Sequence, residues 1–172
     1  KKKLAFVFSG QGTQNTNMGL LLSKSSPEFQ SHLNFVLELF QKNHSLNLAS
    51  YLWNLEKEAE ISSTNITQPL LFAVEYALAK TLLEKGVIPN YVFGHSLGEI
   101  VAATISGIFQ VQDAVAIVVK RSQLMFECAR GAMIAVKDLE SIKKYLVSAR
   151  LSVAAYNSPN QFVLSGDLAS MQ

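Results

Sequence analysis

The residues best suited to chemistry in this sequence lie in the pentapeptide Gly94-His95-Ser96-Leu97-Gly98. A serine flanked by glycines at this spacing is typical of a sharp turn from a strand into a helix, because small residues on either side let the helix pack against the strand. Such a turn presents the hydroxyl close to the first backbone amides of the helix, which can stabilise an oxyanion. Ser96 is therefore our candidate nucleophile.

A purely structural role for Ser96, as the cap of the helix that follows, is the alternative. Glu99 stands three residues later and completes a capping-box pattern. The five-residue motif has many chance matches, so by itself it does not decide between the two roles. The β-forming residues 91–93 before the motif and the helix-compatible residues 100–105 after it favour the nucleophile.

A glycine-containing loop, residues 9–14 (Ser-Gly-Gln-Gly-Thr-Gln), directly follows the apolar residues 4–8. The apolar run is continuous rather than alternating, which predicts a strand of a parallel sheet covered on both faces. Loops that follow such strands commonly present backbone groups to ligands. The loop lacks the third glycine of a dinucleotide fingerprint and the lysine of a phosphate loop, so we do not expect nucleotide binding.

Three further helices are predicted in the sequence after the loop at residues 9–14. The first begins at Ser26-Pro27-Glu28, with proline at the first helical position. It should bury one face, made of Phe29, Leu33, Val36, Leu37 and Phe40. The second is capped by Thr67 and ends at Gly86, and the third runs from residue 113 to about residue 129. The third helix carries Arg121, which is either a solvated side chain or a group that holds a carboxylate through two parallel hydrogen bonds.

A shorter pattern begins at Gly131 and predicts a second subdomain. We expect strands over residues 132–136, 151–156 and 161–164, a helix over residues 138–147, and a turn at residues 157–160. This order, followed by a starting helix, matches two-thirds of a ferredoxin-like unit. The sequence thus predicts an α/β fold: an α/β-hydrolase-like core with a short parallel sheet over residues 1–130, and an incomplete ferredoxin-like subdomain over residues 131–172.

Composition excludes several classes of function. The 172 residues are 49% hydrophobic and carry a net charge of +2, which excludes a disordered chain and does not suit a nucleic-acid partner. Cys128 is the single cysteine, so we expect neither an internal disulfide nor a metal site. No apolar run is long enough for a membrane span or a signal peptide, so we expect a soluble, cytoplasmic protein without a membrane partner. Because the sequence lacks a starting methionine and ends in what looks like a new helix, we expect it to belong to a longer chain.

The spaced motifs, taken in order, resemble the acyltransferase domains of polyketide synthases and, more distantly, the malonyl-CoA:acyl-carrier-protein transacylases of fatty-acid synthesis. The resemblance spans nearly all 172 residues. It rests on Gly10-Gln11-Gly12-Thr13-Gln14, Thr67-Gln68-Pro69, Gly94-His95-Ser96-Leu97-Gly98-Glu99, Arg121, Gly131-Ala132-Met133 and Asn157-Ser158-Pro159.

The resemblance implies a two-step acyl transfer. Ser96 would take an acyl group, malonyl by expectation, from acyl-CoA as an ester and pass it to the phosphopantetheine thiol of an acyl carrier protein. The backbone amides of Gln11 and Leu97 would form the oxyanion hole. The domain itself would bind no cofactor, and its partners would be acyl-CoA, the carrier protein and neighbouring synthase domains.

The resemblance also implies how the acyl group is chosen. Arg121 would pair with the free carboxylate of a malonyl or methylmalonyl group. Gln68 and Asn157 would line the substrate pocket, although either side chain would equally suit a buried partner for backbone groups. The sequence does not distinguish malonyl from methylmalonyl.

The general base is the part of the family pattern that this sequence does not supply. Members of the family use a histidine well downstream of the nucleophile, and the sequence ends before it. His32 and His44 are expected on a surface helix and in a polar loop, and His95 is expected to point away from the site. Because base catalysis contributes about 10²–10⁴-fold, we expect the 172-residue chain alone to be nearly inactive.

Two other functions remain compatible with these residues. A serine hydrolase acting on acyl thioesters shares the Ser96 turn, but it gives no reason for Arg121 or for the loop at residues 9–14. A non-catalytic scaffold domain of a synthase would use Ser96 only as a cap.

Overall fold

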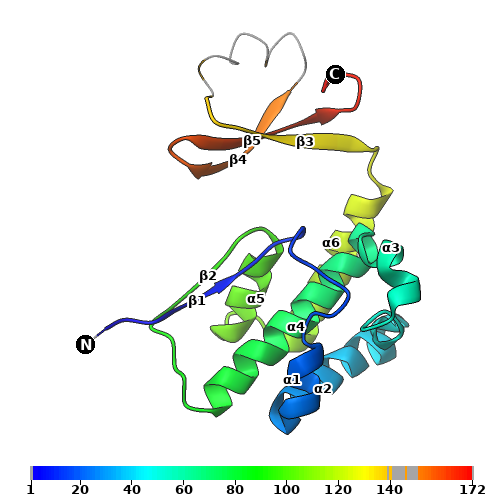
Figure 1. Ribbon diagram of the computed structural model, residues 1–172, viewed down its shortest axis with the longest axis vertical. Coiled ribbons are helices and arrows are strands. Elements are labelled where there is room, and N and C mark those ends of the chain that lie inside the picture. Colours follow the sequence, from blue (N-terminus) through cyan, green and yellow to red (C-terminus); the bar gives the residue numbers. More distant parts are fainter. Residues whose placement is uncertain (1, 139, 141–145, 147–150, 172) are drawn as a thin grey trace. The chain divides into compact units, whose positions relative to one another are not determined.

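The computed structural model describes residues 2–138, 140, 146 and 151–171, and its chain divides into two compact units, Lys1–Glu127 and Cys128–Gln172 (Figure 1). The first unit contains, in order, β1 (Ala5–Phe8), α1 (Leu20–Ser25), α2 (Pro27–His44), the 3₁₀ helices η1 (Leu48–Ser50) and η2 (Leu55–Lys57), α3 (Glu58–Ile61), α4 (Thr64–Glu84), β2 (Tyr91–Gly94), α5 (Leu97–Ile105) and α6 (Val111–Glu127). The second contains β3 (Gly131–Val136), β4 (Ser152–Ser158) and β5 (Gln161–Asp167).

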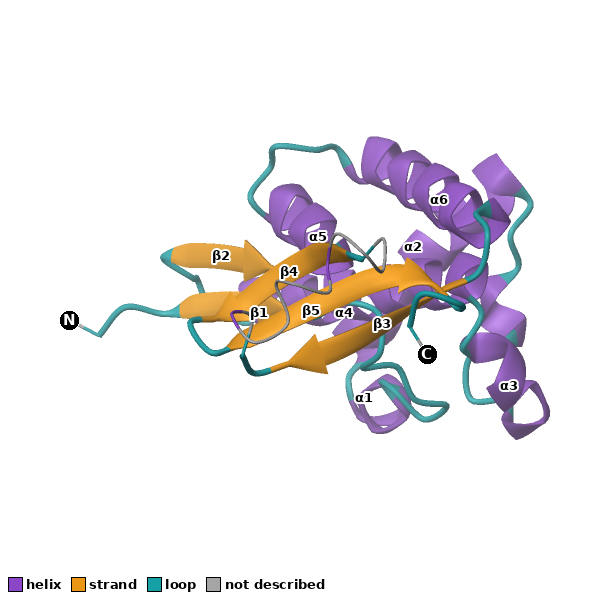
Figure 2. Cartoon of the chain, turned by 90° about the horizontal axis from the view of Figure 1, so that it is seen from above, coloured by secondary structure: helices purple, strands orange, loops and turns teal. Residues whose placement is uncertain are grey.

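The parallel pairing of β1 with β2 brings the two candidate loops together. Phe8 is the register partner of Gly94, so both strands end at the same edge. The backbone N–H of His95 donates to the carbonyl of Phe8 at 3.1 Å and extends the ladder by one bond. Figure 2 shows the two strands side by side with α5 next to them. The loop at residues 9–14 and the Ser96 turn therefore leave the sheet at neighbouring points.

Helix α4 lies at the centre of the first unit and packs against α2, α5 and α6. The core includes fully buried phenylalanines from two helices, Phe29 and Phe40 of α2 and Phe72 of α4. Phe40 meets Phe72 edge-on, with ring centroids 6.2 Å apart. The face predicted for the first helix is confirmed, since four of its five residues are buried and Leu37 is partly buried against the same core.

The prediction that the first strand is covered on both faces was wrong. Val7 of β1 is 76% exposed and its register partner Phe93 on β2 is 57% exposed. Helix α5 packs against both strands, and Phe8, whose side chain alternates with that of Val7, is buried. The continuous apolar run therefore includes a sheet face that stays open in the part of the chain described.

The predicted cap of the second helix was also wrong. Helix α4 begins at Thr64 with Ser63 as its N-cap, so Thr67 lies inside its first turns and is buried. The Thr67 hydroxyl donates back to the carbonyls of Ile61 and Ser63, which makes it a partner of the preceding turn rather than a cap. The predicted end is confirmed, because Gly86 adopts a φ of 79° just beyond the helix.

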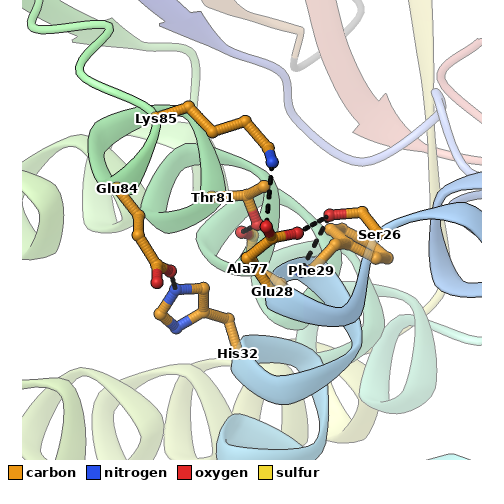
Figure 3. Close-up of polar contacts among 8 residues, drawn as sticks. All are labelled: Ser26, Glu28, Phe29, His32, Ala77, Thr81, Glu84 and Lys85. Carbon is orange, nitrogen blue, oxygen red and sulfur yellow. Dashed lines mark hydrogen bonds and ion pairs between the residues drawn. The ribbon is translucent and has the colours of Figure 1, made fainter.

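A group of polar and charged side chains joins α2 to the C-terminal end of α4 (Figure 3). Glu28 accepts a hydrogen bond from the Ser26 hydroxyl at 2.6 Å and pairs with Lys85 at 3.1 Å. His32 and Glu84 approach within 2.8 Å. Hydrogen bonds from Ser26 and from the Glu28 backbone, with Lys85 nearby, lower the pKa of Glu28 to about 2. We call Ser26, Glu28, His32, Glu84 and Lys85 the α2–α4 clasp.

The second unit holds an antiparallel sheet with the strand order β3-β5-β4. Its three strands overlap the predicted ranges, but β4 continues to Ser158 and β5 to Asp167. The turn is therefore confined to Pro159-Asn160, and Ser158 pairs with Gln161. Seven of the ten residues of the helix predicted over residues 138–147 lie outside the described residues. Asp167 accepts the backbone N–H of Ser170 at 2.7 Å, the contact typical of a helix N-cap. None of the described helices has the length and apolar character that a membrane span requires.

Candidate active site

The Ser96 turn is a strained elbow that tolerates glycine alone on both sides. Ser96 has φ 55° and ψ −110°, a conformation that a residue with a side chain rarely adopts. A Cβ atom at Gly94 would lie 1.9 Å from the carbonyl carbon of Gly98, and one at Gly98 would lie 2.3 Å from the carbonyl oxygen of Phe8. The two glycines therefore let α5 approach the ends of β1 and β2, as the motif predicted.

The Ser96 side chain does not act as a helix cap. Within the described part of the chain, its hydroxyl makes no capping bond to the first turn of α5. The Oγ atom instead accepts a hydrogen bond from Nη2 of Arg121 at 2.9 Å. The Ser96 hydroxyl is thus engaged by a residue 25 positions away and not by the first turn of its own helix, which contradicts the capping role.

Of the two amides expected to form the oxyanion hole, that of Leu97 lies at the elbow, and that of Gln11 follows Gly10, which packs against the elbow. Leu97 is the first residue of α5, so its N–H is one of those that a helix leaves without an internal partner. Gly10 packs against the elbow so closely that a Cβ atom there would lie 2.9 Å from the carbonyl oxygen of His95. Among the described residues, neither the Gln11 nor the Leu97 amide has a hydrogen-bond acceptor.

Arg121 reaches the elbow from α6. Its Nη1 donates to Oε1 of Gln68 while its Nη2 donates to Ser96. Burial lowers the pKa of Arg121 from its usual value, but an arginine titrates so far above neutrality that it stays charged. Within the described residues, no aspartate or glutamate forms an ion pair with Arg121. A part-buried cation, to which the described residues supply no anion, therefore stands next to the candidate nucleophile.

Gln68 connects Arg121 to the glycine-containing loop. Its side chain is only 1% exposed, and its Nε2 donates to Oε1 of Gln11 at 3.2 Å and contacts the sulfur of Met125 at 3.3 Å. The amide oxygen faces the cation and the amide nitrogen faces the loop, so both ends of the group have partners. The structure thus brings Gln11, Gln68, Ser96 and Arg121 into one connected network, with Leu97 beside it.

The remaining candidates are not members of this network. Asn157 lies exposed on β4 of the second unit, so its role in a substrate pocket stays a prediction. His32 belongs to the α2–α4 clasp, and His44 is the last residue of α2 rather than part of a loop. The His95 side chain is exposed, and no histidine side chain of the described residues bonds to Ser96.

Sequence reasoning missed three residues that contact the network or the loop at residues 9–14. Thr64 accepts a hydrogen bond from Nε2 of Gln11 at 3.0 Å, and Glu75 accepts the backbone N–H of Ser9 at 2.9 Å. Met125 stands one helical turn after Arg121. The available signal was the polar residues Thr64, Gln68 and Glu75 on a helix that is otherwise mostly apolar. No group of three or more metal-ligating side chains occurs in the described ranges.

Comparison with known proteins gives a consistent result. A family model described as the acyl transferase domain matches residues 5–172. The mycoketide-CoA synthase of Mycobacterium tuberculosis is 38% identical over 165 residues, which are 95% of this chain and 4% of that protein. The chain thus spans a small part of this curated relative.

Two solved structures share the fold over nearly the whole chain. The acyltransferase domain from the second module of the salinomycin polyketide synthase is 36% identical with a TM-score of 0.90, over 99% of this chain and 40% of that one. A malonyl CoA-acyl carrier protein transacylase from Clostridium perfringens is 29% identical with a TM-score of 0.84, over 99% of this chain and 55% of that one. These matches confirm the predicted α/β fold class, with its short parallel sheet and small antiparallel sheet. The chain therefore belongs to the acyl transferase domain family, that of polyketide synthase acyltransferases and malonyl-CoA:acyl-carrier-protein transacylases.

Proposed function

We propose that this chain loads a malonyl group from malonyl-CoA onto Ser96 and passes it to the phosphopantetheine thiol of an acyl carrier protein in polyketide biosynthesis. The observation that carries the proposal is the contact of Arg121 with Ser96 Oγ at 2.9 Å. A dicarboxylic acyl group needs a nucleophile for one end and a cation for the other. Ser96 and Arg121 offer both at adjacent positions.

The first half-reaction forms an ester and releases CoA. Ser96 Oγ attacks the thioester carbonyl carbon and passes its proton to a general base, a group that the described residues do not supply. The oxygen of the tetrahedral intermediate takes up the negative charge. The amides of Gln11 and Leu97, which have no acceptor among the described residues, are available to stabilise that oxygen. Collapse of the intermediate breaks the C–S bond, and the CoA thiolate takes up a proton. The second half-reaction runs the same steps in reverse with the carrier thiol as nucleophile.

The electrostatics of Arg121 favour an acyl group with a free carboxylate. A guanidinium has five N–H donors, so bonds to Gln68 and Ser96 leave donors for a carboxylate. In a malonyl ester the free carboxylate is separated from the ester carbonyl by a single methylene. It therefore stays close to the serine oxygen, where the cation lies. The part-buried charge would gain the anion that the described residues do not provide.

A serine hydrolase acting on acyl thioesters accounts for Ser96 but not for Arg121. A scaffold domain accounts for neither the strained elbow nor the bond between the two side chains. Water is the acceptor in the hydrolase, whereas the transferase requires the carrier thiol. The fate of the acyl group therefore separates the two enzymes.

The test is mass spectrometry of the full-length protein after brief exposure to malonyl-CoA. We expect a malonyl adduct on Ser96 that disappears when carrier protein is added, and no adduct in the Ser96→Ala variant. Ser106→Ala, on the exposed C-cap of α5, is the matched control and should keep the adduct. Free malonate released without carrier protein would support the hydrolase, and a wild-type protein without an adduct would support the scaffold.

A further inference from the structure

Three polar residues on one stripe of α4 hold the glycine-containing loop. Thr64, Gln68 and Glu75 are separated by four and seven residues, a spacing that places them on the same face of a helix. Each one forms a hydrogen bond to the loop at residues 9–14. Most of the other residues of the helix are buried.

Glu75 fixes the point where the loop leaves β1. Its Oε1 accepts both the backbone N–H and the hydroxyl of Ser9. The Ser9 hydroxyl lies 2.8 Å from Oγ1 of Thr13. The Thr13 hydroxyl also donates to the carbonyl of Gly10 at 3.1 Å. The carboxylate thus orders a chain of hydroxyls that folds the loop on itself.

Thr64 and Gln68 fix the middle of the loop. The Gln11 side chain donates through Nε2 to Thr64 and accepts through Oε1 from Gln68. An amide held at both ends cannot flip without losing both hydrogen bonds. The position of Gln11 is therefore set by α4 through bonds that span more than fifty residues of sequence.

The opposite side of the loop has no freedom to move towards the elbow. Gly10 already lies against His95, and a Cβ atom at Gly10 would stand 3.4 Å from the Cβ of Ser96. The loop is thus confined between the elbow and α4. Loss of a bond to α4 would let the loop move in the one direction that takes the Gln11 amide away from Ser96.

We propose that Glu75 and Thr64 are positioning residues that hold the Gln11 amide at oxyanion distance from the Ser96 site. This role rests on the proposed acyl transfer. Neither side chain touches the reacting atoms, and both act through the loop. The second carboxylate oxygen of Glu75 is buried and has no hydrogen-bond partner in the described chain. Burying a polar atom without a partner destabilises the folded state, and a positioning role gives a reason for a glutamate at this place.

The first experiment measures loop order by NMR relaxation in the 172-residue chain, without substrate. We expect Glu75→Leu to lower the amide order parameters of Gly10, Gln11 and Gly12 from the rigid range of about 0.85 to below about 0.6. Glu75→Gln keeps an oxygen acceptor for the Ser9 N–H and should restore most of the order. Glu84→Gln, the same change on the same helix but in the α2–α4 clasp, is the matched control and should leave the loop unchanged.

Three results would overturn the assignment of Glu75. One is an ordered loop in Glu75→Leu, and another is Glu75→Gln being as disordered as Glu75→Leu. The third is a fall in order that is equal throughout α4, since that would report general unfolding instead of loop release.

The second experiment follows the rate of Ser96 acylation in the full-length protein with Thr64 replaced. Thr64→Val removes the acceptor at nearly constant shape, and we expect kcat to fall about tenfold with KM unchanged. Thr64→Ser should restore the rate. A change confined to KM, or a serine variant no better than valine, would contradict the positioning role. If the wild-type protein forms no acyl-enzyme, the proposed function fails, while the NMR result still decides whether α4 holds the loop.

Discussion

The two ends of α4 use the same kinds of side chain for different tasks. Gln68, near its start, contacts Arg121 from a buried position, and Glu75, near its middle, contacts the loop at residues 9–14 from a part-buried position. At its end, Glu84 and Lys85 pair with His32 and Glu28 of α2 from positions that solvent reaches. The contact distances in the two sets are similar, but the side chains that face the site are more buried than those of the α2–α4 clasp.

Burial decides what each set of contacts can do. Solvent-accessible polar contacts such as those of the α2–α4 clasp contribute little to stability, because water competes for both partners. A buried amide that loses its partner leaves an unsatisfied group, which is costly and displaces its neighbours. We therefore expect substitutions at the start of α4 to change the chemistry, and substitutions at its end to change stability slightly.

Arg121→Ala tests the site end most strongly. Loss of the cation should lower malonyl loading by about 10²-fold, because hydrogen bonds to a charged group are the strong ones. Acetyl loading should fall much less, since an acetyl group has no carboxylate for Arg121 to hold. Competitive loading from equal malonyl-CoA and acetyl-CoA, read by mass spectrometry of the full-length protein, gives both values. Equal losses for the two acyl groups would contradict the clamp.

Gln68→Leu should have the next largest effect. It leaves Nη1 of Arg121 and the Gln11 side-chain oxygen without their partners, so we expect a loss of about 1–3 kcal/mol in the free energy of unfolding. Glu84→Gln, at the other end of the helix, should cost less than about 1 kcal/mol. Urea unfolding of the 172-residue chain compares them directly. Equal losses would remove the distinction between the two ends.

Glu28→Gln should have the smallest effect, and one that depends on pH. The pKa of Glu28 is lowered from 4.5 to about 2 in the folded chain, so its stabilisation is fully present above pH 4.5 and is lost as the pH falls towards 2. The stability gap between wild type and Glu28→Gln should therefore narrow across that interval. Urea unfolding at a series of pH values measures the gap, with Glu38→Gln, from an exposed pair on α2, as the control. A gap that stays constant would show that Glu28 keeps its usual pKa.

The local parts of the site were predictable from the sequence. The glycines two residues before and two residues after Ser96 indicated a tight elbow, and the structure has no room for a side chain at either position. The buried face of α2 follows from the helical spacing of its apolar residues. Both features depend on residues close together in the chain, where steric rules act directly.

The contacts across the chain were not predictable in the same way. Glu75 meets Ser9 across 66 positions, and no spacing rule relates a carboxylate in one helix to a loop that far away. The open face of β1 also escaped prediction, because a continuous apolar run does not say which neighbour covers it. Only the family resemblance placed Arg121 at the site, because the pattern of its own helix did not distinguish a solvated arginine from one that binds a carboxylate.

The backbone of Ser96 has one further consequence, which concerns selection. A residue with a side chain at φ 55° and ψ −110° stores about 1–3 kcal/mol of conformational strain. Glycine at this position would relieve the strain and would remove the hydroxyl. A protein selected only to stay folded would thus tend to lose its serine there. If Ser96 is retained among descendants of this chain, it is retained for its chemistry, at the expense of folding stability.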